Sequence, residues 1–195
     1  AARRVGARLG KVACVLDRSW SASGAAETRR RPLAVALAIS AFVRAAAREA
    51  RAFWTQPTPD ELLVEPYGQT DLVTPLLDAM AWQPELIVVV SDGFDNDPPG
   101  TASELVAAAR ARGLSPLVLH VNPVFDPDSL GPKPLGPAVP TIGIRDAEDL
   151  PTAIAFGQLA HGGGSLAELE RVLAARVAHF LGDAAAAGDD GALAG

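Results

Sequence analysis

The chain has 195 residues, of which 49% are hydrophobic and 21% charged, and its formal net charge is −6. This length suits one domain of ordinary size, and the composition is that of a soluble globular protein. The negative charge argues against nonspecific binding of nucleic acids, and the single cysteine, Cys14, excludes an internal disulfide framework.

No stretch of the sequence is long and apolar enough to cross a membrane, and no signal peptide opens it. We therefore expect a cytoplasmic protein without membrane contact. Met80 is the only methionine, so we expect the chain to be a processed protein or a piece of a larger one. One folded domain is expected over residues 1–182, followed by a disordered tail rich in Ala, Gly and Asp over 183–195.

Six stretches are typical of strands. Residues 11–17 and 85–91 contain uninterrupted apolar runs, which indicate strands buried on both faces. Residues 61–66 are short and carry charges, as an edge strand would. The other expected strands span 51–55, 116–121 and 141–145.

Helices are expected between and after these strands. Pro32 suits the first turn of a helix that continues to about Glu49. Thr101 or Ser103 could cap a helix that ends at Gly113. The remaining expected helices span 71–82, 149–159 and 165–181. The alternation of strand and helix predicts an α/β fold, a doubly wound and mainly parallel sheet with helices on both faces.

Oxygen-bearing side chains follow the first buried strand. Asp17, Ser19 and Ser21 occupy alternate positions directly after its apolar run. Open α/β sheets bind ligands at the carboxyl ends of their strands, and oxygen ligands suit Mg²⁺, Mn²⁺ or Ca²⁺. Asp and Ser are also common turn residues, so this pattern alone also fits a simple turn.

Two later stretches strengthen the metal interpretation. Thr70 lies on a turn that opens a helix, and Asp92 ends the second buried strand. Two carboxylates at the same sheet edge, with a threonine loop between them in sequence, can converge on one cation.

These residues resemble the metal-ion-dependent adhesion site of von Willebrand factor A domains. The resemblance covers Asp17-x-Ser19-x-Ser21, the loop from Gly68 to Leu72 and Ser91-Asp92-Gly93, in the family's order and over about 80 residues. Gln69 stands where a second glycine is usual, and Ser91 where threonine is usual. The resemblance implies a six-stranded sheet with one antiparallel edge strand.

The resemblance further implies a binding module and not an enzyme. Ser19, Ser21 and Thr70 would hold one divalent cation, with Asp17 and Asp92 bound directly or through water. A carboxylate from a protein partner would complete the shell, and the last helix, 165–181, could shift on binding. Neither the partner nor the oligomeric state follows from the sequence.

Two alternatives stay open. A metal-dependent phosphotransferase or hydrolase could use Asp17 as nucleophile, although neither Lys11 nor Lys133 is placed to bind phosphate. The chain could also be the A domain of a Ro-type RNA-binding protein, although no helical-repeat ring accompanies it and its charge is −6. We expect no direct binding of nucleic acid.

Other candidate residues are interpreted as structural. Cys14 is expected to be a buried small hydrophobe, and His120 to be a core or edge histidine. Asp95 and Asp97 are expected in a solvated loop, since they lack calcium-loop spacing. Residues 161–164 (His-Gly-Gly-Gly) are read as a helix-ending loop, because no nucleophile elbow occurs. Residues 29–31, all arginine, fit a solvated helix start or a contact to an acidic partner.

Overall fold

The computed structural model describes residues 9–23, 31–58, 60–95, 98–114, 116–124, 132–144, 149–160 and 165–189. The chain divides into two compact units, residues 1–150 and 151–195. The sheet and all the residues of the expected metal site belong to the first unit. The single domain expected over 1–182 stays a prediction.

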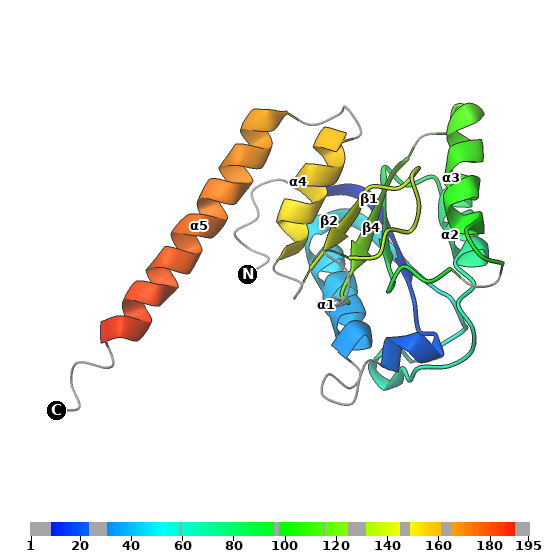
Figure 1. Cartoon of the computed structure of the whole chain (residues 1–195), viewed down its shortest axis with the longest axis horizontal. Coiled ribbons are helices and arrows are strands. Elements are labelled where there is room, and N and C mark those ends of the chain that lie inside the picture. Colours follow the sequence, from blue (N-terminus) through cyan, green and yellow to red (C-terminus); the bar gives the residue numbers. More distant parts are fainter. Residues whose placement is uncertain are drawn as a thin grey trace. The chain divides into compact units, whose positions relative to one another are not determined.

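The first unit is built on a parallel sheet (Figure 1). Its strands are β1 (Leu9–Leu16), β2 (Ala47–Trp54), β3 (Leu86–Val90), β4 (Leu117–Asn122) and β5 (Thr141–Gly143). They lie in the order β2-β1-β3-β4-β5, and every neighbouring pair is parallel. The α/β class and the parallel sheet are therefore confirmed.

Helices cover both faces of this sheet (Figure 1), with α1 (Arg31–Ala46) on one side and α2 (Val73–Ala81) and α3 (Thr101–Ala111) on the other. Ala13 and Val15 of β1 share a buried core with Leu76 of α2 and Val106 of α3. Because side chains alternate along a strand, the intervening residues of β1 face α1.

Cys14 is one of these intervening residues. It is fully buried, and burial raises the pKa of its thiol to about 12. The thiol therefore stays protonated at neutral pH and packs as a small hydrophobe, as expected.

The main differences from the sequence prediction lie around β2. Helix α1 ends at Ala46, and β2 begins at the next residue, whereas the helix was expected to reach Glu49. The predicted strand at 61–66 is wrong, because Glu61–Leu63 forms a 3-10 helix. No antiparallel pairing occurs among the described strands.

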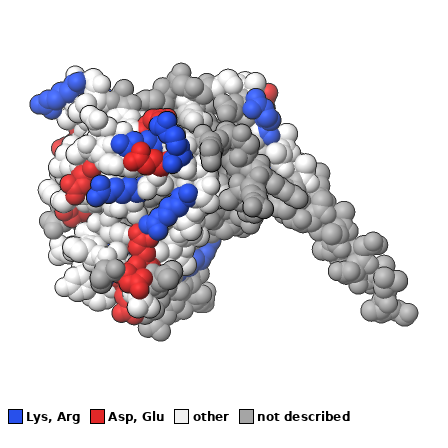
Figure 2. Space-filling view, turned by 180° about the vertical axis from the view of Figure 1, so that it is seen from behind, with Lys and Arg blue, Asp and Glu red and all other residues white. Residues whose placement is uncertain are grey.

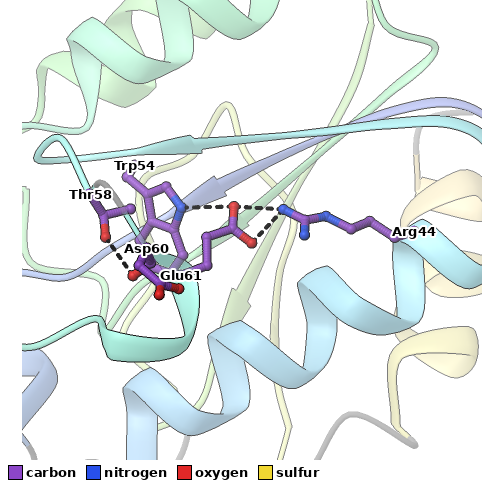
Figure 3. Close-up of polar contacts among 5 residues, drawn as sticks. All are labelled: Arg44, Trp54, Thr58, Asp60 and Glu61. Carbon is purple, nitrogen blue, oxygen red and sulfur yellow. Dashed lines mark hydrogen bonds and ion pairs between the residues drawn. The ribbon is translucent and has the colours of Figure 1, made fainter.

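Glu61 shows why this segment departs from a strand (Figure 3). Its Oε1 accepts hydrogen bonds from Arg44 Nη2 of α1 at 2.6 Å and from Trp54 Nε1 of β2 at 3.4 Å. Thr58 Oγ1 donates to the carbonyl of Asp60 just before it, at 3.1 Å. The turn thus directs the Glu61 side chain onto α1 and the end of β2, and the backbone does not extend along the sheet.

The second unit contains α4 (Leu150–Ala160) and α5 (Leu166–Asp189). Helix α5 includes residues 183–189 of the tail that was expected to be disordered, while 190–195 lie outside the described residues. The C-terminal part of α5 is rich in alanine, the residue with the highest helix propensity. Among the described helices, none has the length and apolar character needed to span a membrane.

Candidate metal centre

Asp17 and Asp92 lie at the carboxyl ends of two neighbouring strands. Asp17 directly follows β1, and its backbone N–H donates to Val90 O at the end of β3, at 3.0 Å. Asp92 follows β3 after one residue. After β1 the chain continues to β2 on one side, and after β3 it continues to β4 on the other side, so both carboxylates lie where the strand order reverses. Open α/β sheets bind ligands at this point.

One hydrogen-bonded group follows β1 and consists of Asp17, Ser19 and Ser21. The Asp17 carboxylate accepts the Ser19 N–H at 2.8 Å and the Ser19 hydroxyl at 3.1 Å. The Ser19 and Ser21 hydroxyl oxygens are 2.8 Å apart. Asp17 and Ser19 are buried, whereas Ser21 is exposed. The side-chain oxygens of the Asp-x-Ser-x-Ser motif are therefore joined by hydrogen bonds into one cluster.

The Thr70 loop lies against this cluster. Tyr67 N–H donates to Arg18 O at 2.6 Å, and Trp20 N–H donates to Gly68 O at 3.1 Å. These two bonds hold residues 67–68 beside the serine loop. Thr70 itself is 3% exposed, and within the described part of the chain no hydrogen bond joins its hydroxyl to the other four predicted ligands.

The Asp92 side chain is held by its own turn. Its Oδ1 accepts the N–H of Phe94 at 3.0 Å, and its carbonyl accepts Asn122 Nδ2 at 3.0 Å. Asn122 Nδ2 also donates to Lys133 O at 3.1 Å. Gly93 has φ +82°, and a Cβ there would lie 2.5 Å from Lys133 O. The close approach of the two segments therefore requires glycine after the carboxylate.

Asp17 and Asp92 share a small cavity of about 10 Å³, near the size that holds one water molecule. Among the described residues that line it, only these two are ionisable. The lining residues are Asp17, Ala22, Pro32, Val90, Ser91, Asp92 and Pro123.

Burial and charge both act on Asp17. Burial, together with the nearby Asp92 charge, raises the pKa of Asp17 from 3.8 to about 6, although hydrogen bonds from Ser19 and Thr55 oppose the rise. A buried carboxylate near a like charge is costly to ionise, and a bound cation reverses this cost. The donors that could hold such a cation are Asp17, Asp92 and the neighbouring hydroxyls.

Thr55 and Asn122 support the site and were not singled out from the sequence. The Thr55 hydroxyl donates to Asp17 Oδ1 at 3.4 Å and accepts the Arg18 N–H at 3.1 Å. Both residues lie at the carboxyl end of a strand, Thr55 after β2 and Asn122 at the end of β4. The rule that singled out Asp17 and Asp92, a polar side chain where a strand ends, could have found them.

His120 is a buried structural residue and not a metal ligand at this site. One ring nitrogen lies 3.0 Å from the Ser91 hydroxyl, and the other lies 3.0 Å from Thr141 Oγ1. Burial lowers the pKa of the imidazole to about 4, so the ring is neutral at pH 7. The expected core histidine is confirmed.

Asp95 corrects the sequence interpretation, because it is 7% exposed and not solvated. Its Oδ2 accepts the Ala102 N–H in the first turn of α3 at 2.8 Å, and burial raises the pKa of this carboxyl. The Thr101 hydroxyl donates backwards to Pro98 O at 2.7 Å, and Gly100 is the N-cap residue of α3. The expected cap by Thr101 or Ser103 is therefore wrong. Asp97 lies outside the described residues.

Two other stretches that the sequence singled out lie partly or wholly outside the described residues. Arg31 begins α1, whereas Arg29 and Arg30 lie outside the described residues. The stretch from His161 to Gly164 also lies outside them.

Within the described ranges, no three Asp, Glu, His or Cys side chains gather as metal ligands. The candidate centre instead combines two carboxylates with hydroxyl groups. The chain matches no protein-family model, and no curated protein or solved structure shows significant similarity to it. The function proposed below therefore rests on the geometry of the site and on the resemblance of its motif.

Proposed function

We propose that the chain is a von Willebrand factor A-like binding module that holds one divalent cation and binds a protein partner through it. Mg²⁺ or Mn²⁺ is the expected cation, and Ca²⁺ is the alternative. The observation that supports this most directly is the cavity lined by both Asp17 and Asp92, with the Asp17 carboxylate bonded to the Ser19 hydroxyl, which is linked to that of Ser21. The implied six-stranded form with an antiparallel edge strand stays a prediction.

Each ligand has a chemical role in this proposal. Ser19, Ser21 and Thr70 provide neutral oxygens, while Asp17 and Asp92 provide negative charge directly or through water. These five groups leave at least one position of an octahedral shell open. A carboxylate from an Asp or Glu of the partner then completes the shell by filling that position.

The surface charge also favours a protein partner over a nucleic acid. On the face drawn in Figure 2, basic and acidic side chains of the described residues lie intermingled. A polyanion would instead need a continuous basic surface.

Calorimetric titration with Mn²⁺ and Mg²⁺ tests the metal site. Asp92→Ala removes one of the two cavity carboxylates, so we expect metal binding to be lost while the circular-dichroism spectrum stays native. Asp78→Ala is the matched control, because Asp78 is an exposed carboxylate on α2. Unchanged metal binding by Asp92→Ala would show that the site assignment is wrong.

A phosphotransferase that uses Asp17 as nucleophile remains the enzymatic alternative. It needs a lysine for phosphate, and the structure places Lys133 beside the Asp92 turn, closer to the site than the sequence suggested. The Lys133 ammonium itself lies over the Phe94 ring, 3.0 Å from its centre. Hydrolysis of p-nitrophenyl phosphate that requires Mg²⁺ and Asp17 would favour this alternative.

A further inference from the structure

Three exposed aromatic residues lie on the loops that carry the candidate ligands. Trp20, Tyr67 and Phe94 are 64%, 59% and 46% exposed. Trp20 lies between Ser19 and Ser21 in sequence, and the Phe94 backbone bonds to the Asp92 side chain. We call these three residues the aromatic rim. Large aromatic side chains near a polar centre are typical of the residues that carry binding energy in protein interfaces.

Trp20 and Tyr67 form one apolar platform. Their ring centroids are 6.1 Å apart with an interplanar angle of 49°, and the two backbone bonds between their loops fix their relative position. A platform that is already ordered loses little conformational entropy on binding, so an apolar side chain laid on it gains affinity.

Two cations flank the aromatic rim. The Arg18 guanidinium is 5.9 Å from the Tyr67 ring centroid, and it donates to two backbone carbonyls, Glu65 O at 3.1 Å and Pro57 O at 2.8 Å. Lys133 lies over Phe94 on the other loop. In the described part of the chain, no carboxylate forms an ion pair with either cation. Neither cation is therefore neutralised by a carboxylate of the described residues.

We propose that the aromatic rim, with Arg18 and Lys133, binds an acidic protein segment that carries a large apolar side chain and a second acidic residue beside its metal-binding carboxylate. The apolar side chain packs on Trp20 and Tyr67, and the second acidic residue pairs with Lys133. This inference rests on the proposed metal-dependent function and specifies the chemistry of its partner.

The probe is a library of short synthetic peptides with one fixed central Glu and all amino acids at the flanking positions, screened with the full chain in Mg²⁺. We expect selection of Trp, Tyr, Phe or Leu at one flank and of Asp or Glu at another. For a selected peptide, Trp20→Ser combined with Tyr67→Ser should weaken binding at least about tenfold. Lys133→Glu should remove the preference for the second acidic residue.

Two matched controls test whether these effects are local. Leu114→Ser changes an exposed apolar residue between α3 and β4, and Arg112→Glu reverses an exposed charge next to it. Neither should alter the selected sequences. Mg²⁺-dependent binding of the library without any flanking preference would overturn this inference and leave the proposed function standing. Flanking preferences that persist in EDTA and in Asp92→Ala would instead support the aromatic rim and overturn the metal assignment.

Discussion

Asp17 destabilises the metal-free protein and is also a ligand in the proposed metal site. Its carboxylate is buried at the end of β1, where Asp92 adds a like charge. Ser19 and Thr55 offset only part of the cost by hydrogen bonding. Such a residue destabilises the metal-free protein and becomes favourable when a cation compensates its charge.

In EDTA, this destabilisation should make the free energy of unfolding depend on pH. The pKa of Asp17 rises from 3.8 in the unfolded chain to about 6 in the folded protein, so the folded state holds the proton more tightly. The resulting stability is fully present below pH 3.8 and is lost as the pH rises through about 6. At pH 7 the loss is about 3 kcal/mol of the free energy of unfolding.

Asp17→Asn isolates this contribution, because it keeps the shape of the side chain and cannot titrate. We expect the difference in the free energy of unfolding between this variant and the wild type to grow in favour of Asp17→Asn between pH 4 and pH 7. Urea denaturation in EDTA at several pH values measures it. Parallel pH profiles for the two proteins would contradict the raised pKa.

At the scale of elements, the site depends on how the strand ends and loops are joined. Asn122, at the end of β4, binds the carbonyls of both Asp92 and Lys133. Gly93 lets these two segments approach within the distance that any Cβ would block. The Asp92 turn is thus positioned by β4 and by the segment around Lys133, and not by β3 alone.

Gly93→Ala tests this arrangement, and Gly100→Ala is its control. Both glycines have positive φ, +82° and +80°, but a Cβ at Gly100 would meet no atom within 4 Å. Gly100→Ala should therefore cost only the backbone strain, about 1–2 kcal/mol. Gly93→Ala should cost more and should also weaken Mg²⁺ binding, because Lys133 or the Asp92 turn must move. Chemical denaturation and calorimetry measure the two effects, and equal losses in both variants would contradict this role of Gly93.

The elements also show how far sequence reasoning reaches. Asp17 and Asp92 were found because each follows a continuous apolar strand, and the parallel sheet confirms both strands. The start of β2 was missed because Ala47–Ala50 favours helix by composition, whereas pairing from Leu9↔Ala47 onwards imposes a strand. The 3-10 turn at Glu61 depends on Arg44 and Trp54, which are distant in sequence, so no local pattern could predict it.

At the scale of the whole molecule, the candidate centre occupies the place where this topology leaves a crevice. β1 lies between β2 and β3. The chain leaves β1 toward β2 and leaves β3 toward β4, which are opposite directions along the sheet. The loops after β1 and β3 therefore diverge, and their polar residues can surround a ligand without burying backbone groups. A cation bound at this position would connect two loops that the sheet alone leaves separate.

Cation binding should therefore stabilise the folded first unit. A ligand that binds only the folded state stabilises it by RT ln(1 + [L]/Kd). With roughly 10 mM Mg²⁺ and a dissociation constant of about 1 mM, the gain is about 1.4 kcal/mol. Each kcal/mol moves the Tm of a domain of this size by about 2–4 °C, so we expect a rise of roughly 3–6 °C.

Tryptophan fluorescence can follow this transition in the first unit alone, because Trp20, Trp54 and Trp82 all belong to residues 1–150. Asp17→Asn removes one charged ligand, so Mg²⁺ should raise the Tm of this variant less than that of the wild type. In EDTA the variant should melt higher than the wild type, since the repulsion between Asp17 and Asp92 is gone. An equal Mg²⁺-induced rise in both proteins would mean that the cation binds elsewhere, and the central assignment of Asp17 would then fail.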